Sequence, residues 1–273
     1  MDNERDFEKA RRLAVRSDQP LSIFARPLKW LRNCWRGDVS KSFLLIFCVP
    51  LGLLFLVGGT VLSVRFFPGD YDWRYQVMCS LASPAKNPAG YLYWCLGFAL
   101  SNIMGLPTCG YFARWFSPWS PRIAFLSGHA LRTGYTAGIL LGLESAFFPN
   151  YGGSVYKAHE ITAIVTFACF YLGVAGFWFC LTAWLFKARR CPTWFGIGVF
   201  LLGSVPMTGI MLSQAWLFFD PNRPGWVSRE WIALGIPFWL SFAFWEWLAF
   251  CGLVFCICVL AVVLPAKTGE TRE

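Results

Sequence analysis

Residues 43–66 read FLLIFCVPLGLLFLVGGTVLSVRF, an apolar run with no charged side chain before Arg65. A helix needs about 20 such residues to cross the hydrocarbon core of a bilayer. Six runs in the chain meet this requirement: Phe43–Phe66, Tyr91–Ala113, Ile123–Phe147, Ile161–Phe186, Trp194–Phe219 and Leu234–Leu264. These runs lack the alternation of barrel strands, and backbone groups in lipid must satisfy one another. The sequence therefore predicts an all-α bundle of six transmembrane helices.

The composition agrees with a membrane protein and excludes an ordinary soluble enzyme. The 273 residues are 56% hydrophobic and 14% charged, whereas soluble proteins carry about 25% charged residues. Most of the 11 cysteines lie inside the apolar runs without the spacing of metal ligands, which is typical of small packing residues. We expect a multi-pass protein of the plasma or inner membrane in three parts: a basic tail (1–41), a bundle (42–265) and a short tail (266–273).

The positive charges predict the orientation of the bundle. Of the lysines and arginines, 17 lie in the two tails and in the second and fourth loops, against six in the first, third and fifth loops, when Arg65 at the end of the first run is counted with the first loop. Cytoplasmic segments carry such an excess, so both termini are expected to be cytoplasmic. The net charge of +9 has the same origin. No nucleic-acid-binding motif accompanies it, so nucleic acid is not an expected partner.

The end of the basic tail, Leu21–Arg36, has helical periodicity. Phe24, Leu28, Leu31 and Trp35 recur at helical spacing, with basic residues on the other faces. Such a stretch can lie on an anionic leaflet as an interfacial helix. The alternative is a basic flank that only sets the orientation of the bundle.

Charged or polar side chains interrupt three of the apolar runs: the third carries His129, Arg132 and Glu144, the fifth carries Gln214, and the sixth carries Glu246. Charged groups within a span are costly and usually pair in the bundle interior. At a rise of 1.5 Å per residue, Arg132 and Glu246 are expected at similar depths near the middle of the membrane. The sequence therefore predicts an ion pair between them, which would serve either packing alone or the transport of a solute.

The third run also contains small residues at every fourth position: Ala130, Gly134, Gly138 and Gly142. Small residues at this spacing let helix backbones approach closely in lipid. We therefore expect the third helix to lie at the centre of the bundle.

Polar residues gather in the segments predicted to face outward, where they could form a polar cup at the outer leaflet. Its predicted members are Asp70, Asp72, Ser80, Asn87, Glu144, His159 and Glu160. A carboxylate beside a histidine could do acid–base chemistry on a lipid headgroup, and the alternative is a hydrogen-bonded rim. No metal site or cofactor is expected, because His129 and His159, the only histidines, are predicted near opposite leaflets.

Three stretches resemble a known family: DYDWRYQVMCSLASPAKNPAGYLYW (Asp70–Trp94), LGLESAFFP (Leu141–Pro149) and HEITAIVTFACFYLG (His159–Gly173). Together they resemble the Frag/DRAM/Sfk-like membrane proteins and a related uncharacterised bacterial group of six-helix proteins. The positions that match are Ser80, Asn87, Pro88, Gly142, Leu143, His159, Ala163 and Phe167. The family's usual Ser-Asp or Ser-Glu is Ser80-Leu81 here, so no catalytic role is carried over. The resemblance implies six membrane helices and a link to lipid handling or membrane organisation.

The expected function is to bind or organise lipid, or to act as a subunit beside a membrane protein partner. One alternative is a lipid-modifying enzyme that uses Glu144, His159 or Glu160 at the outer face. The other is a carrier of small solutes or ions that uses Arg132, Gln214 and Glu246. An enzyme needs His159 within hydrogen-bond reach of a carboxylate in an open pocket, whereas a carrier needs a polar path to the middle of the membrane.

Overall fold

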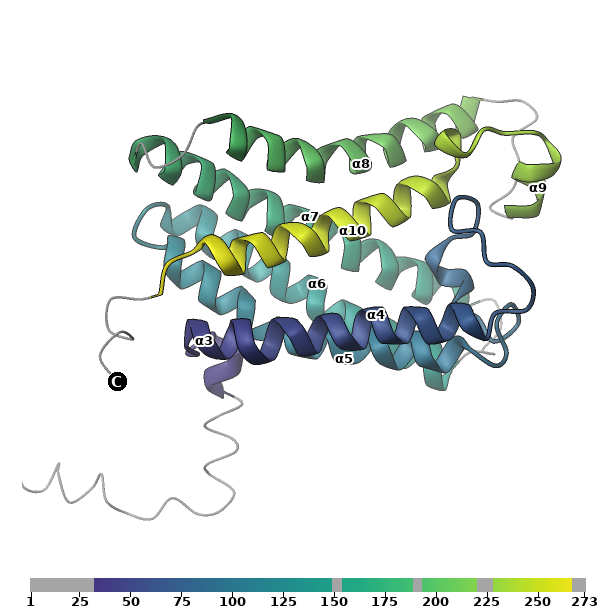
Figure 1. The fold of residues 1–273 in the computed structure, drawn as a ribbon, viewed down its shortest axis with the longest axis horizontal. Helices are drawn as coiled ribbons and strands as arrows, with labels where there is room; N and C mark the ends of the chain where they lie inside the picture. Colours follow the sequence, from purple (N-terminus) through teal and green to yellow (C-terminus); the bar gives the residue numbers. More distant parts are fainter. Residues whose placement is uncertain (1–31, 149–153, 189–192, 220–227, 267–273) are drawn as a thin grey trace, which may run out of the picture.

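The computed structural model describes residues 32–148, 154–188, 193–219 and 228–266, and this part of the chain is helical throughout, with no strand. Its long helices run side by side along the longest axis of the molecule (Figure 1). The principal helices are α4 (Val49–Arg65), α5 (Tyr91–Phe116), α6 (Pro121–Phe147), α7 (Ser154–Ala188), α8 (Thr193–Phe219) and α10 (Phe242–Val263). Shorter elements are α3 (Lys41–Phe43), a π-helical turn (Leu44–Cys48), α9 (Ser228–Ala233) and two 3₁₀ turns (Met78–Ser80 and Phe238–Leu240).

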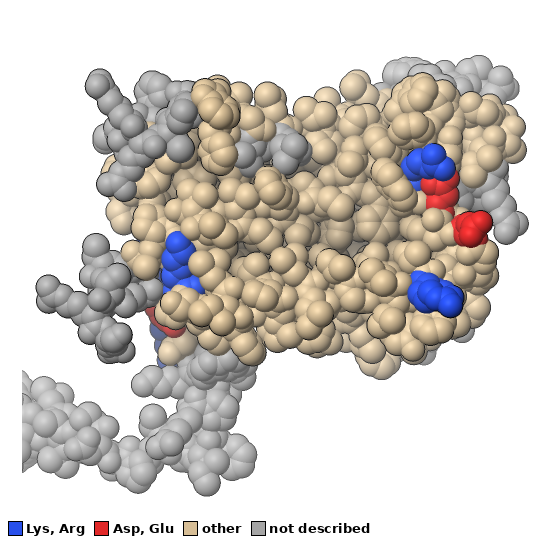
Figure 2. Space-filling view, in the orientation of Figure 1, with Lys and Arg blue, Asp and Glu red and all other residues tan. Residues whose placement is uncertain are grey.

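Four of these segments are long and apolar enough to cross a membrane: Lys41–Arg65, Tyr91–Phe116, Ala158–Leu185 and Phe242–Val263. The face of the bundle seen in Figure 2 has an uncharged band between two charged ends. Large apolar side chains are exposed near the middles of long helices, such as Leu54 of α4 at 64% and Leu172 of α7 at 62%. A surface of this kind is suited to lipid and not to water. The chain is therefore an α-helical membrane protein.

The two ends of the bundle carry different segments, and we name them the loop end and the tail end. The loop end carries residues 66–90, the end of α6 and the start of α10, and the tail end carries residues 32–40 and 117–120. Residues 32–36 are helical, whereas the rest of the predicted interfacial helix, 21–31, lies outside the described residues. A π-helical turn occupies Leu44–Cys48 directly before Pro50, whose ring nitrogen cannot donate to a carbonyl in the preceding turn.

The last helix differs from its prediction. The apolar run was expected to form one helix from Leu234, but α10 begins at Phe242. Gly235 adopts a positive φ of 65°, and Pro237 starts a separate 3₁₀ turn at Phe238–Leu240. A positive φ and a proline both interrupt a right-handed helix, so the apolar residues before Phe242 form a turn instead.

The third helix, α6, packs between α5 and α7, which confirms the close contacts predicted for it but not a position at the centre of the bundle, because its contacts with α4, α8 and α10 are few. Its stripe of small residues makes the contacts. An added Cβ at Gly142 would lie 2.6 Å from the Cys95 carbonyl oxygen of α5, and one at Gly134 would lie 3.0 Å from the Phe170 nitrogen of α7. The absence of side chains at these positions therefore lets three helix backbones approach closely.

Candidate functional site

The loop end is closed by residues 66–90, and Asn87 holds this loop in place. Asn87 is fully buried, and its amide nitrogen lies within hydrogen-bond distance of the Ser63 carbonyl (3.1 Å), the Ser63 hydroxyl (2.8 Å) and the Leu81 carbonyl (3.3 Å). Its side-chain oxygen accepts a hydrogen bond from the Gly90 backbone N–H. The Asn87 amide therefore joins the loop to the end of α4 through its hydrogen bonds. A buried amide is costly unless it is hydrogen-bonded in this way.

The same loop is fastened to α10 by two further groups. The Glu246 carboxylate accepts a hydrogen bond from the Met78 backbone N–H at 2.8 Å. The indole N–H of Trp247 donates to the Tyr71 hydroxyl at 3.1 Å, and that hydroxyl donates to the Gln76 carbonyl at 2.9 Å. Burial raises the pKa of Tyr71, so its hydroxyl keeps the proton that it donates.

The predicted ion pair between Arg132 and Glu246 is wrong. Because α10 begins at Phe242, Glu246 lies in its first turns at the loop end and not at the middle of the bundle. Arg132 instead donates to the Trp35 carbonyl at 3.2 Å, in the segment at the tail end. The side chain of Gln214, the third residue predicted at this depth, lies outside the described side chains.

The residues predicted to form an outer cup fall into separate groups at the loop end. Asp72 pairs with Arg74 within its own loop, and this guanidinium lowers the pKa of Asp72. Ser80 is buried within 3.4 Å of the Lys86 ammonium, while Asn87 is committed to Ser63 and Leu81. Asp70 and Glu160 are exposed. These side chains hold the loop or face outward, and the structure does not join them into one site.

His159 lies beside Ser145 at the end of α6. Ser145 follows Glu144, the carboxylate predicted to lie in the same cup as His159. The Nδ1 atom of His159 lies 3.3 Å from the hydroxyl oxygen of Ser145, and Glu144 and Glu160 are the carboxylates that act on the ring electrostatically. One oxygen of Glu144 is buried without a hydrogen-bond partner. The hydrogen-bond partner of His159 is thus a hydroxyl, whereas an acid–base pair would require a carboxylate at that distance.

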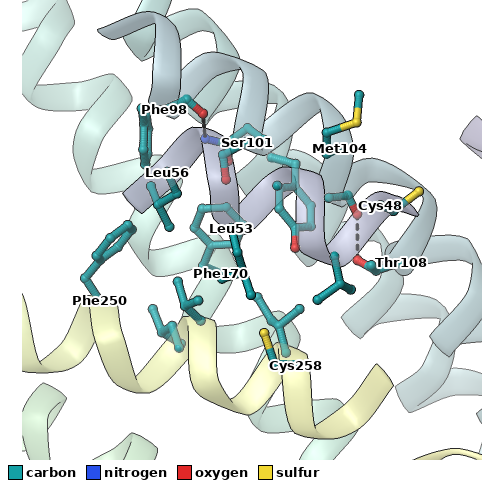
Figure 3. Close-up of a pocket in the computed structure, with 18 residues that line it drawn as sticks. Cys48, Leu53, Leu56, Phe98, Ser101, Met104, Thr108, Phe170, Phe250 and Cys258 are labelled. Atoms are coloured by element: carbon teal, nitrogen blue, oxygen red, sulfur yellow. Dashed lines mark hydrogen bonds between the residues drawn. The ribbon is translucent and has the colours of Figure 1, made fainter. Parts of the chain in front are cut away.

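A cavity of about 80 Å³ lies between α4 and α10, floored by α5, α6 and α7. Figure 3 shows labelled side chains around it from α4 (Leu53, Leu56), α5 (Phe98) and α10 (Phe250). We call this cavity the α4–α10 crevice. The two helices that flank it make little contact with each other, because α4 packs on α5 and α10 packs mainly on α8. Its lining is overwhelmingly apolar, so it suits an apolar ligand.

A few polar groups interrupt this apolar lining. Asn102 is buried and donates to the Phe98 carbonyl of its own helix at 2.7 Å, and Thr108 donates to the Gly105 carbonyl at 2.6 Å. Tyr135 reaches the crevice from α6, where its ring occupies the space left by Gly105. A small number of polar groups within an apolar pocket usually fixes the orientation of a ligand.

The α4–α10 crevice was not predicted from the sequence. It forms because α4 and α10 make little contact with each other, and an apolar run does not show which helices will pack together. Asn102 and Tyr135 were the available signals, as polar side chains inside apolar runs. None of the residues predicted as site residues lines the crevice. Among the described residues, no three His, Cys, Asp or Glu side chains are grouped so as to hold a metal ion.

Comparison of the chain with protein-family models, with curated proteins and with solved structures finds no match in any of the three.

Proposed function

We propose that this chain is a six-helix integral membrane protein with both termini on the cytoplasmic side, and that it binds a lipid chain in the α4–α10 crevice. Six spans require α6 and α8 to cross the membrane with the four more apolar segments. Both helices have 27 residues, enough for the hydrocarbon core. The lower apolarity of α6 accords with its place between α5 and α7, where glycines meet neighbouring backbones and not lipid.

The observation that carries the proposal is an apolar crevice flanked by two helices that face the uncharged band. Lipid tails surround such helices, so an acyl chain can enter between them without crossing a polar surface. An engineered apolar cavity of roughly 150 Å³ holds benzene. The α4–α10 crevice, at about 80 Å³, therefore accommodates a segment of alkyl chain and not a headgroup.

The alternatives receive less support from the same geometry. A carrier needs a polar path to the middle of the membrane, yet Arg132 and Glu246 are hydrogen-bonded to segments at opposite ends of the bundle and do not meet. An enzyme at the loop end needs a carboxylate within hydrogen-bond reach of His159, and its hydrogen-bond partner there is Ser145. Lipid binding by a protein that organises membranes or serves a membrane protein partner requires neither arrangement.

A pair of adjacent leucines gives the test a matched control. Leu53 lines the crevice, whereas Leu54 is 64% exposed and lies outside it. The purified protein would be illuminated with phosphatidylcholine that carries a diazirine in its acyl chain, and the crosslinked peptides identified by mass spectrometry. We expect crosslinks in α4 and α10 that Leu53→Trp abolishes, because the larger ring fills the crevice, and that Leu54→Trp retains. Equal crosslinking of both variants at these helices would refute the proposal.

A further inference from the structure

Arg132 lies on α6 with its guanidinium directed toward the tail end. One terminal nitrogen donates to the Trp35 carbonyl at 3.2 Å, and the guanidinium carbon lies 5.2 Å from the centre of the Trp35 ring. The Nε atom is enclosed and has no hydrogen-bond partner. A backbone carbonyl and an indole face hold the guanidinium in one place, but neither neutralises its charge.

No carboxylate among the described residues pairs with Arg132. Asp38, the acid in the same segment as Trp35, forms an ion pair with Arg114 of α5. Glu246 is held by the loop at the other end. A full charge within a membrane helix is normally paired or drawn to the interface. The counter-ion of Arg132 is therefore to be sought outside the described part of the chain.

The surroundings of Arg132 carry further positive charge. Arg122 and His129 lie on the same face of α6, at helical spacing from Arg132, and both are exposed. Arg36, which follows Trp35 directly, is also exposed. The His129 Nδ1–H donates to the Phe125 carbonyl at 2.9 Å, so the other nitrogen of the neutral ring is an acceptor and offers no donor to an anion. The guanidinium groups of Arg36 and Arg122 are the additional donors, and arginine side chains near a fixed guanidinium suit a phosphate group.

We propose that Arg132, with Arg36 in the segment that it contacts, binds the phosphate group of an anionic phospholipid in the leaflet at the tail end. The terminal nitrogen of Arg132 that does not contact Trp35 is the donor offered to the phosphate. Trp35 positions the guanidinium at the level of the headgroups, since long basic side chains reach toward the interface in this way. This site uses no residue of the α4–α10 crevice, so it does not depend on the proposed acyl-chain site.

The test measures headgroup preference and not acyl-chain crosslinking. The full-length protein would be reconstituted in nanodiscs of an equimolar mixture of phosphatidylglycerol and phosphatidylcholine, and the lipids it retains would be counted by native mass spectrometry. We expect one retained phosphatidylglycerol whose affinity falls about ten-fold in Arg132→Gln, as for loss of one charge-assisted hydrogen bond. The matched control is Arg65→Gln, an exposed arginine at the loop end, which should leave retention unchanged.

Two further arms decide the ligand and guard against misfolding. Arg132→Lys keeps the charge and a donor for Trp35, so it should fold and keep part of the preference. Excess inorganic phosphate should not displace the retained lipid, because it lacks the acyl chains; displacement would assign the site to free phosphate and overturn the lipid. Wild-type protein without a preference for phosphatidylglycerol, or Arg132→Gln and Arg132→Lys both binding as wild type, would overturn the site itself.

Discussion

Glu246 and Arg132 are each hydrogen-bonded to a backbone group from a non-helical or short segment. Glu246 accepts from the Met78 N–H at the start of a 3₁₀ turn, and Arg132 donates to the Trp35 carbonyl. Such backbone groups are free because they are not used inside a long helix. Side chains within the helices therefore fix the two irregular segments that close the ends of the bundle.

Separate partners predict that mutations of the two residues are independent. Glu246→Leu should leave the buried Met78 N–H without an acceptor and lower the free energy of unfolding by about 1–3 kcal/mol. Glu246→Gln, which keeps an acceptor oxygen, should cost less. Because Arg132→Leu disrupts contacts at the other end, the losses in the double variant should add to within about 0.5 kcal/mol.

Unfolding in detergent–denaturant mixtures, followed by circular dichroism, measures the four free energies of this cycle. A double variant clearly more stable than the sum of the two losses would show that the charges interact and would restore the ion pair. The sequence could not separate these residues, because the depth of Glu246 was calculated from a helix that began at Leu234. The turn formed by Gly235 and Pro237 shortens that helix and moves Glu246 to its end.

At the scale of elements, glycine contacts set the distance between α4 and α5. Gly59 of α4 and Gly97 of α5 face each other so closely that a Cβ added to Gly59 would lie 2.6 Å from the Tyr93 carbonyl oxygen and 3.0 Å from the Gly97 Cα. Both of these neighbours are backbone atoms, which cannot turn away as a flexible side chain can. The close approach of α4 to α5 therefore depends on the absence of a side chain at Gly59.

Gly58, the preceding residue in α4, has nothing within 4 Å of an added Cβ and so provides a matched control. Gly59→Ala should force the two backbones apart and destabilise the protein by about 1–3 kcal/mol. Gly58→Ala should stabilise it by up to about 1 kcal/mol, because alanine favours the helix. Thermal unfolding in detergent micelles measures both, and equal effects of the two substitutions would contradict the packing of α4 on α5.

Long periodic elements were predictable from the sequence, whereas helix ends and the candidate site were less so. Apolar runs near Tyr91–Ala113 and Ile123–Phe147 correspond closely to α5 and α6, because length and hydropathy decide membrane helices. The stripe that includes Gly134 and Gly142 correctly placed α6 between two neighbours. The α4–α10 crevice depends on long-range packing of helices far apart in the sequence, for which local periodicity carries no information.

At the scale of the whole molecule, polar side chains close the ends of the bundle and apolar ones face the band between them. Charged residues lie at both ends in Figure 2, whereas the crevice has an apolar lining like the uncharged band between them. The predicted cup placed binding at the polar loop end. Asn87 and Asp72 are instead engaged by the loop itself, whereas the candidate cavity, the α4–α10 crevice, is apolar.

The orientation of the whole bundle is tested by labelling cysteines from one side of the membrane. Native Cys79 is a poor probe, because burial raises the pKa of its thiol to about 12 and little reactive thiolate forms at neutral pH. Asp70 and Ser117 are better positions, since both are exposed, one at the loop end and one at the tail end.

The excess of positive charge in the tails and in the loops at the tail end predicts that this end is cytoplasmic. A membrane-impermeant maleimide applied to intact cells should therefore label Asp70→Cys and spare Ser117→Cys. After the membrane is permeabilised, both variants should be labelled more strongly than the wild-type chain, whose native Cys34 at the tail end also becomes accessible; the excess shows that the Ser117→Cys thiol is reactive when it can be reached. Native cysteines that face lipid, such as the exposed Cys251 of α10, are inaccessible to a water-soluble reagent in both conditions. If Ser117→Cys is labelled before permeabilisation and Asp70→Cys is protected, the orientation is the reverse of the one predicted. If both are labelled, the two ends lie on one side of the membrane, which excludes an odd number of crossings between residues 70 and 117.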